Sequence, residues 1–372
     1  MDLIIKTQAG LEGLLQEELF TLTEKHGTPL KRAVRLDGAN DRDIFAINYL
    51  SRLATHVLWI LKEGQVRNET ELYDLTRTVS WQEHMKVDQT FAIYPTITSP
   101  NFKHTGYAAL KVKDGIADYF RDQFGRRPNV DKDDPDTPIN IHIFDERATL
   151  SLNTSGAPLY HRGYKEGKGV ATINEVLASG MIQLANWTGE TPFYDPMCGT
   201  GSLPIEACLL AKNIPSQRFR SEFAFESFYS LDLSAFRELK RNTSRQSQNL
   251  STSIHGSDIH PEAIRLSKVN ARGARVTDDI QWRKADFFAM APPAAEGTLI
   301  VNPPYSERMS LEDEEAFYKS IGDKFKQEYT GWSAWVLSGN EEAIKHIGLK
   351  PKHKLELFNG PLQCDYRCYE LY

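Results

Sequence analysis

Apolar and polar residues follow two different rhythms along the chain, which change near Thr172. Up to about residue 160, short segments that alternate apolar and polar residues, typical of strands, are interspersed with segments of helical periodicity. The expected strands cover residues 2–7, 31–36, 56–66, 90–97, 139–146 and 147–156, and the expected helices cover residues 10–22, 43–54, 69–79 and 106–124. Residues 125–138 are rich in Pro, Asp and Lys and predict an exposed loop. This half has an α+β pattern.

From about Thr172 onward, hydrophobic strands alternate with amphipathic helices, as in a parallel sheet that helices cover on both faces. The expected strands are residues 191–196, 253–259, 280–288, 298–304 and 333–339, then a closing pair at 352–360 and 364–372; the helices are 202–212, 260–274, 311–329 and 340–347. The closing pair predicts an antiparallel hairpin at one edge. We therefore expect an α/β sheet that is mostly parallel.

Composition narrows the class of protein without naming a function. The chain has 372 residues, of which 40% are hydrophobic and 25% charged, as in an ordinary globular protein of two or three domains. The apolar run at the N-terminus is short and is broken by Lys6, so we expect no signal peptide, no membrane span and a cytoplasmic location. The spacing of the four cysteines predicts free thiols and no metal site. With a net charge of −6, binding to nucleic acid would require a local basic patch.

The segment "DPMCGTG" ends the first strand of the parallel sheet, where open α/β sheets bind ligands. Gly199 and Gly201 allow a tight turn and a close approach of backbone to ligand. The third glycine of a dinucleotide fingerprint is replaced by Pro204, and no P-loop lysine follows. Asp195 would repel a pyrophosphate and attract an ammonium or sulfonium group. The pattern therefore favours a cationic ligand.

Further polar residues end the next three strands. Asp258 in "GSDIHP" suits two ribose hydroxyls, Asp286 in "ADFF" suits an adenine amine, and Asn302 begins "NPPY". Any one of the acids alone is more often a helix cap. Their order on successive strands predicts one ligand site.

The motif series "DPMCGTG", "GSDIHP", "ADFF" and "NPPY" resembles class I S-adenosylmethionine-dependent methyltransferases that modify exocyclic or amide nitrogens. Together with "HTGYAALKVKDGIAD" and "LNTSGAPLYHRGYKEG", nearly the whole chain resembles the THUMP-containing bacterial enzymes that make N2-methylguanosine in large-subunit ribosomal RNA. The resemblance implies a ferredoxin-like N-terminal region (1–65), a THUMP RNA-binding domain (66–160) and a Rossmann-like methyltransferase domain (161–372). It implies S-adenosylmethionine as cofactor and ribosomal RNA, or its precursor, as partner.

The resemblance also assigns roles to individual residues. The cofactor-binding set is Asp195, Gly199 and Gly201 for the methionine portion, Asp258 for the ribose and Asp286 for the adenine, with Ile259 and Phe287 beside them. Asn302 and Pro303 accept the hydrogens of the target amine, and Tyr305 stacks on the base. Accepting both hydrogens would aim the nitrogen lone pair at the methyl group. Where the family has a glycine after the tyrosine, this chain has Ser306.

The RNA-binding residues expected on this basis are basic and lie in the N-terminal half and the following linker: Lys103, His104, Lys111, Arg126, Arg127, Arg162 and Lys165. A solvated linker explains "YHRGYKEGKG" about equally well without the resemblance. Some relatives carry a second methyltransferase domain, whereas this chain ends at Tyr372, so we expect one methylation.

Two other functions remain open from the sequence. "NPPY" serves adenine amines as well, so a DNA or RNA adenine-N6 methyltransferase is one alternative; no DNA target-recognition domain is identifiable, which opposes the DNA form. The other is a non-catalytic RNA-binding or ribosome assembly factor, which the intact Asp195, Asp258, Asn302 and Tyr305 oppose.

Overall fold

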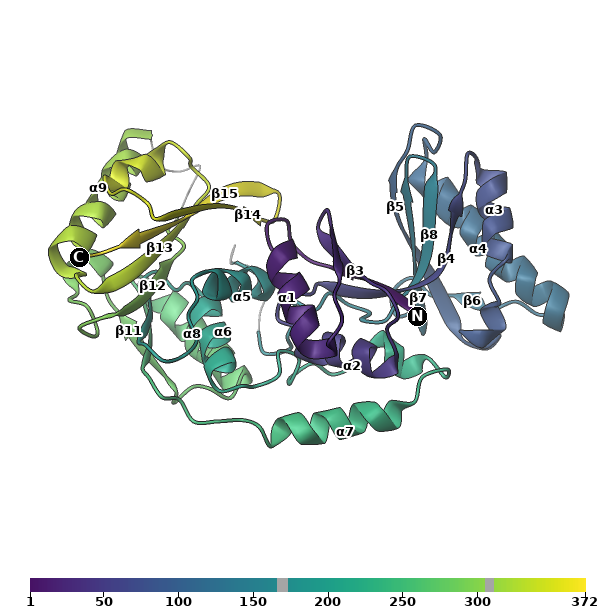
Figure 1. Cartoon of the computed structure of the whole chain (residues 1–372), viewed down its shortest axis with the longest axis horizontal. Coiled ribbons are helices and arrows are strands. Elements are labelled where there is room, and N and C mark those ends of the chain that lie inside the picture. The colour runs from purple at the N-terminus through teal and green to yellow at the C-terminus, as the bar shows by residue number, and fades with distance from the viewer. Residues whose placement is uncertain (166–172, 305–310) are drawn as a thin grey trace.

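The computed structural model describes residues 1–165, 173–304 and 311–372, which form two sheets, one in each half of the chain (Figure 1). The N-terminal half contains β1 (Asp2–Lys6), α1 (Glu12–Thr23), β2 (Thr28–Leu30), β3 (Ala33–Leu36), α2 (Asp41–Leu50), β4 (His56–Gln65), α3 (Glu69–Arg77), β5 (Thr90–Thr98), α4 (Thr105–Phe124), β6 (Asn129–Val130), β7 (Thr137–Phe144) and β8 (Arg147–Asn153). Their strands lie in the order β2-β3-β1-β4-β8-β7-β5-β6. One mixed sheet thus runs through the whole half.

Strand β4 joins the two N-terminal domains that the sequence predicts. It pairs antiparallel with β1 on one side and with β8 on the other, so the sheet is continuous across residue 65. The division at residues 65 and 160 stays a prediction. The expected loop at 125–138 contains the short strand β6 and the start of β7, and β2 is a strand that the sequence pattern did not predict.

The C-terminal half contains α5 (Glu175–Leu184), β9 (Phe193–Asp195), α6 (Ser202–Ala211), α7 (Leu233–Ser244), β10 (Ile254–Asp258), α8 (Pro261–Gly273), β11 (Ile280–Lys284), β12 (Gly297–Val301), α9 (Leu311–Glu328), β13 (Trp332–Ser338), β14 (His353–Asn359) and β15 (Leu362–Glu370). The strand order is β11-β10-β9-β12-β13-β15-β14. The strands from β11 to β13 are parallel, and β15 is antiparallel to both of its neighbours. The predicted parallel sheet with a closing antiparallel hairpin is confirmed.

Some local elements differ from the expected ones. The predicted helix at 340–347 is a single 3₁₀ turn at Ala343–Ile347, while α5 and α7 were not predicted. Helix α5 is buried over most of its length, so its sequence is too uniformly apolar to show an amphipathic period. No helix in the described part of the chain is long and apolar enough to cross a membrane, and all four cysteines are free and buried.

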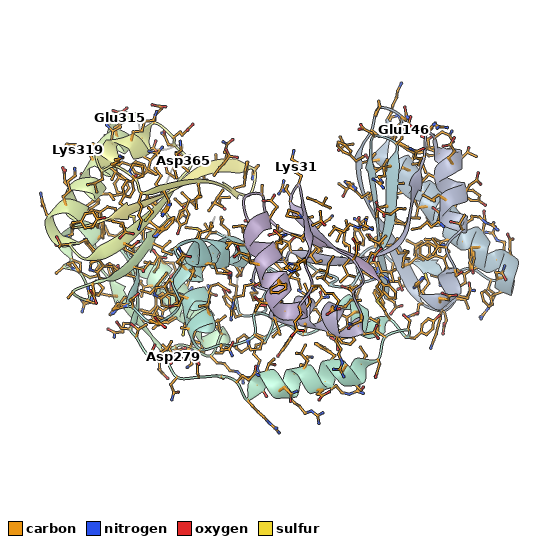
Figure 2. All side chains as sticks on the ribbon, viewed as in Figure 1. Lys31, Glu146, Asp279, Glu315, Lys319 and Asp365 are labelled. Atoms are coloured by element: carbon orange, nitrogen blue, oxygen red, sulfur yellow. The ribbon has the colours of Figure 1, made fainter. Side chains whose placement is uncertain are left out.

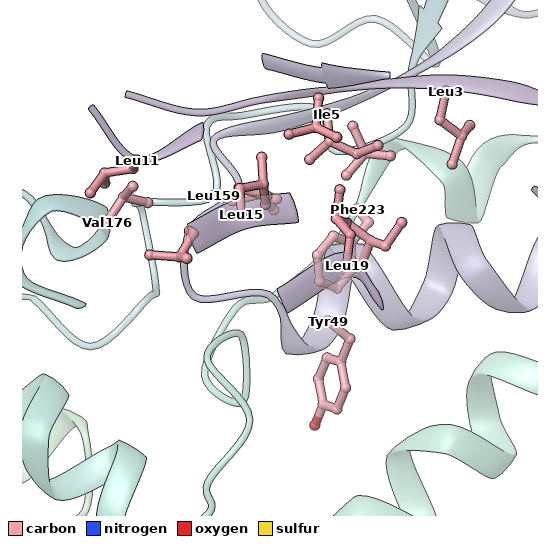
Figure 3. Packing of buried hydrophobic residues seen from close by; sticks show 14 of the residues in the cluster. Leu3, Ile5, Leu11, Leu15, Leu19, Tyr49, Leu159, Val176 and Phe223 are labelled. Carbon is pink, nitrogen blue, oxygen red and sulfur yellow. The ribbon is translucent and has the colours of Figure 1, made fainter. Parts of the chain in front are cut away.

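Apolar packing connects the two halves. Leu11, Leu15 and Leu19 lie on one face of α1 at helical spacing and are fully buried. Figure 3 shows Leu11 beside Val176 of α5. A Cβ on Gly180 of α5 would lie 2.7 Å from a methyl carbon of Leu11, so α1 and α5 approach closely.

Helix α9 covers one face of the C-terminal sheet and turns its polar side to solvent. Tyr318 and Phe325 are fully buried, whereas Glu315 and Lys319 are labelled on the outer side of the helix in Figure 2. Lys319 pairs with Asp323 one turn later at 2.6 Å. This amphipathic division is the pattern that predicted the helix.

Candidate active site

A cavity of 510 Å³ lies at the carboxyl ends of β9, β10 and β12, where the sheet order changes direction. Its lining comes from every motif of the predicted series: Asp195, Gly199, Asp258, Ile259, Asp286, Phe287, Asn302 and Pro303 all contribute. Residues that are 108 positions apart in the sequence, such as Asp195 and Pro303, therefore meet at one place.

The loop after β9 follows the conformation that its glycines predict. Gly199 and Gly201 both have positive φ, at 53° and 85°. A Cβ on Gly199 would meet nothing within 4 Å, so this position leaves open space at the cavity. Gly201 does not line the cavity: its missing Cβ accommodates the ring of Trp282, which would lie at 2.7 Å, and it caps α6. The structure thus separates the two glycines, one facing the ligand space and one packing against the sheet.

Asp258 is held in place by two backbone amides. Its Oδ2 accepts a hydrogen bond from the amide of Gly199 at 3.0 Å and its Oδ1 accepts one from the amide of His260 at 2.9 Å. A carboxylate has about four acceptor positions, so Asp258 keeps capacity for ligand hydroxyls at the cavity wall. The bond to Gly199 fixes the loop after β9 against the end of β10.

Asp195 is almost completely buried beside Asp258. Its side chain is 2% exposed and accepts one hydrogen bond, from the amide of Met197 at 3.2 Å. Burial, followed by the charge of Asp258, raises the pKa of the Asp195 carboxyl well above its usual range. A cationic ligand in the cavity would stabilise the ionised carboxylate, as the sequence analysis expects of this acid.

The third motif forms an apolar end of the cavity. Asp286 caps a 3₁₀ turn, Phe287–Ala289, by accepting from the amide of Phe288 at 3.0 Å. Phe287 is buried, while Ile259, directly after β10, is 56% exposed although it lines the cavity. An exposed isoleucine beside an aromatic residue offers a flat apolar surface of the kind that a purine ring would cover.

Asn302 follows β12 directly and has a side-chain acceptor that no described residue satisfies. Its Oδ1 is buried and has no hydrogen-bond partner among the described residues. Pro303 and Pro304 follow, and neither has a backbone N–H that would fill this role. Buried oxygens are normally paired, so an unpaired one at a cavity indicates a place for an external donor. Tyr305, the expected stacking residue, lies outside the described residues.

Other lining residues come from elements without a motif. Phe317 belongs to α9 and Asn359 ends β14, and both line the cavity. The Phe317 ring packs edge-on against Phe288 at 5.6 Å. Sequence analysis could not assign them, because only the packing of α9 and the terminal hairpin brings them to the strand ends.

The basic residues predicted to bind RNA differ in how far their side chains are exposed to solvent. Arg162 is 1% exposed, its guanidinium donates to the carbonyls of Leu159 and Arg52, and its Nε lies 3.8 Å from a carboxylate oxygen of Glu206. The assignment of Arg162 to RNA binding is therefore wrong, because its side chain is buried and its guanidinium contacts groups inside the protein. Lys165 forms an ion pair with Glu175 at 3.1 Å.

The other members of that set lie around α4. Lys103 and His104 are exposed just before the helix, and Arg126 and Arg127 are exposed after it. Lys111 lies over the ring of Tyr107 at 5.3 Å. None of them lines the cavity at the strand ends, and their contact with RNA stays a prediction.

Comparison with known proteins places this site in a family. Residues 162–368 match the family model described as "RMKL-like, methyltransferase domain", and residues 66–153 match the THUMP domain. A protein of Synechocystis named "Putative RNA methyltransferase" is 37% identical over 98% of this chain and 95% of its own length. The "Ribosomal RNA large subunit methyltransferase K/L" of Psychromonas ingrahamii is 34% identical over 99% of this chain. The chain spans only 50% of that second relative.

Solved structures show the same architecture over the full length. A possible methylase from Clostridium difficile has a TM-score of 0.90 at 26% identity and covers 100% of this chain and 98% of its own. The structure described as "SMU.472, a putative methyltransferase complexed with SAH" has a TM-score of 0.91 at 24% identity, with coverage of 100% of this chain and 98% of its own. The predicted family, mixed α/β fold and cofactor are confirmed. The chain belongs to the THUMP-containing, S-adenosylmethionine-dependent RNA methyltransferases.

Proposed function

We propose that this protein transfers a methyl group from S-adenosylmethionine to the exocyclic N2 of a guanine in large-subunit ribosomal RNA. The observation that carries the proposal is the buried Oδ1 of Asn302, which no described residue pairs with and which lines the same cavity as Asp195 and Asp258. An amide oxygen accepts hydrogen bonds, and the N–H groups of an amine could donate to it. The named K/L relatives and the resemblance to guanine-N2 enzymes support the choice of base and RNA.

The residues of this chain fit the cofactor by charge and by space. Asp195 lies where a positive charge would offset its burial, Asp258 keeps free acceptor positions, and the missing Cβ of Gly199 leaves room for backbone approach. When bound, S-adenosylmethionine supplies an electrophilic methyl group on a sulfonium. We assign its methionine end to Asp195 and Gly199, its ribose to Asp258 and its adenine to the side of Asp286, Ile259 and Phe287.

Asn302 and Pro303 position the target nitrogen. An aromatic amine is a weak nucleophile, since its lone pair is delocalised into the ring. Acceptance of its two hydrogens by the Asn302 oxygen and the Pro303 carbonyl would turn the lone pair toward the methyl group and stabilise the positive charge that develops on nitrogen. The methylated amine is then acidic enough to lose a proton to solvent, so the mechanism requires no strong base.

The experiment is methyl transfer from labelled cofactor to ribosomal RNA isolated from a strain without this gene, followed by nucleoside analysis. N2-methylguanosine is the expected product. N6-methyladenosine would retain the amine-binding role of Asn302 and overturn the base. If neither naked RNA nor ribosomal precursors accept methyl groups, the proposed activity is wrong and a non-catalytic RNA-binding role replaces it.

A further inference from the structure

Helix α9 carries a buried lysine on the face that packs against the C-terminal sheet. Lys324 is 7% exposed, and the residues beside it on this face, Ile321 and Phe325, are apolar and fully buried. Lysine is rarely buried to this extent, because its charge must be paired and its N–H groups must find acceptors. Neither the sequence motifs nor the proposed reaction uses Lys324, so its contacts indicate what it does.

The Lys324 ammonium connects α9 to the 3₁₀ turn Phe287–Ala289, which follows β11. Its Nζ donates a hydrogen bond to the backbone carbonyl of Phe288 at 3.1 Å. The same Nζ lies 2.6 Å from a carboxylate oxygen of Glu328, one turn later on α9, and the side chain of Glu328 is 38% exposed. The acid thus balances the buried charge from the solvent side, while the lysine holds the turn on the inner side.

Phe288 is held through its backbone and through its ring, and it lines the cavity at the strand ends. Its amide donates to Oδ1 of Asp286 at 3.0 Å, and its carbonyl accepts from Lys324. Its ring packs edge-on against Phe317 of α9 at 5.6 Å. Helix α9 therefore fixes the turn at two points, Lys324 and Phe317.

Helix α9 is itself a firm support for the turn. A Cβ on Gly322 would lie 1.9 Å from the carbonyl oxygen of Ile347, so the helix backbone lies directly against the 3₁₀ turn Ala343–Ile347. On the side of the cavity, the ring of Phe325 packs against that of Phe287 at 6.2 Å. Close packing on both sides leaves the helix little freedom to shift.

We propose that Lys324 is a positioning residue for the adenine of S-adenosylmethionine. By fixing the Phe288 carbonyl, it orients the turn from which the Asp286 carboxylate accepts the adenine amine. Lys324 is not among the described residues that line the cavity, so it acts through Phe288 and Asp286. Groups that bind a ligand keep a productive geometry only when packed and hydrogen-bonded neighbours support them. This inference rests on the proposed placement of the adenine beside Asp286.

Positioning of Asp286 differs from general stabilisation of the fold in which ligands it affects. A lysine that only stabilises the fold would change the affinity of all ligands of the cavity alike. A lysine that orients Asp286 would change the contact with the adenine amine alone. S-adenosylhomocysteine has this amine, whereas S-inosylhomocysteine has a carbonyl oxygen in its place. The ratio of their dissociation constants, inosyl over adenosyl, therefore measures the amine contact.

The test is calorimetric titration of the full chain with each ligand, without RNA. In the unmodified protein the ratio should be about ten, since a carboxylate accepts from the amine and faces an oxygen in the analogue. Lys324→Met keeps an unbranched side chain without the ammonium and should lower the ratio to about three, mainly by weakening the adenosyl ligand. The matched control is Lys319→Met, which should leave the ratio unchanged. Lys319 is an exposed lysine of the same helix, paired with Asp323 one turn later (Figure 2).

A double-variant cycle tests whether Lys324 acts through Asp286. Asp286→Ala should lower the ratio to about one, and adding Lys324→Met should change it no further. An unchanged ratio in Lys324→Met, folded by circular dichroism, would overturn the proposal. If that variant does not fold, Glu328→Gln replaces it by removing the partly exposed acid beside the ammonium, and an unchanged ratio there would overturn the proposal as well.

The measurements also separate this inference from the proposals on which it rests. A ratio of about one in the unmodified protein would overturn the placement of the adenine beside Asp286, and the role of Lys324 with it. A ratio that falls in Asp286→Ala but not in Lys324→Met would overturn the role of Lys324 alone. Because the readout is cofactor binding without RNA, failure of methyl transfer to guanine would leave this test intact.

Discussion

Two cavities of this protein, one in each half of the chain, are built in different ways. The methyltransferase cavity gathers acids, Asp195 and Asp258, at the ends of parallel strands. The other cavity, which we call the N-terminal cavity, has a volume of 990 Å³ and lies on the face of the mixed sheet and against residues 219–227. It mixes the cations Lys6 and Arg220 with four acids, Asp133, Asp134, Asp136 and Glu222. Each contains a buried asparagine oxygen that has no hydrogen-bond partner within residues 1–165, 173–304 and 311–372, Asn302 in one and Asn140 in the other. The comparison separates a site whose charged side chains are all acids from one in which acids and cations are mixed.

The largest expected effect comes from removing the buried carboxylate of Glu206, which contacts residues of both halves of the chain. Glu206 of α6 lies within 4.0 Å of Arg52 and Arg162, and it accepts hydrogen bonds from Tyr164 and Ser179 at 2.9 and 2.8 Å. Glu206→Ala leaves two buried guanidinium groups without that carboxylate, so we expect a loss of about 3–5 kcal/mol in the free energy of unfolding. Urea denaturation measures it. The exposed Glu238→Ala is the control, and equal stability of both variants would contradict a structural role for Glu206.

The next prediction concerns only the cavity at the strand ends, where Asn302 is proposed to assist methyl transfer. Asn302→Ala should lower the turnover number by about 10²–10³, because it removes an oxygen that stabilises the developing charge on nitrogen. Cofactor affinity, measured by calorimetry, should remain close to that of the unmodified protein. Asn249→Ala, in an exposed loop, is the matched control. Loss of cofactor binding in Asn302→Ala would place Asn302 in the cofactor site instead.

A third change separates cofactor binding from catalysis within the same cavity. Asp258→Ala removes a charged acceptor from the proposed ribose position and releases the amide of Gly199. Charged hydrogen bonds contribute about 1.5–3 kcal/mol, so the dissociation constant of the cofactor should rise about tenfold to a hundredfold. Calorimetric titration measures it against Asp278→Ala, an exposed acid that does not line the cavity. If both variants bind equally well, Asp258 does not hold the ribose.

The construction of the two cavities also explains what the sequence could reveal. Carboxyl ends of parallel strands share one edge, so Asp195, Asp258 and Asn302, each directly after a hydrophobic strand, are predictable neighbours. Lys6 and Tyr94 share a cavity only because β4, β8 and β7 lie between their strands in that order. No local pattern encodes this strand order.

Arg162 shows the opposite limit of sequence reasoning. Its setting among tyrosines, histidine and lysine resembles an RNA-contacting linker, yet the side chain is buried against Glu206. The sequence shows that a side chain is charged, but it does not show whether that side chain is buried. Buried arginines with a carboxylate partner therefore look like surface cations until the fold is known.

The last prediction contrasts the two cavities by their dependence on pH. His56 has a pKa of about 4 in the folded protein, below its ordinary value of 6.5, so the unfolded chain binds more protons between those values. Stability from this group therefore rises as pH rises from 4 to 6.5. Asp195, whose pKa is raised by burial and by Asp258, acts in the opposite direction, because ionisation of its buried carboxyl as pH rises destabilises the fold.

Variants isolate the His56 contribution from other titrating groups. Between pH 7 and pH 5 the unmodified protein should lose about 2 kcal/mol through His56, and His56→Gln should lose that much less over the same range. Urea unfolding at both pH values measures the difference, and Asp195→Asn should change the pH dependence with the opposite sign. If His56→Gln has the same pH dependence as the unmodified protein, His56 is not held neutral by its surroundings.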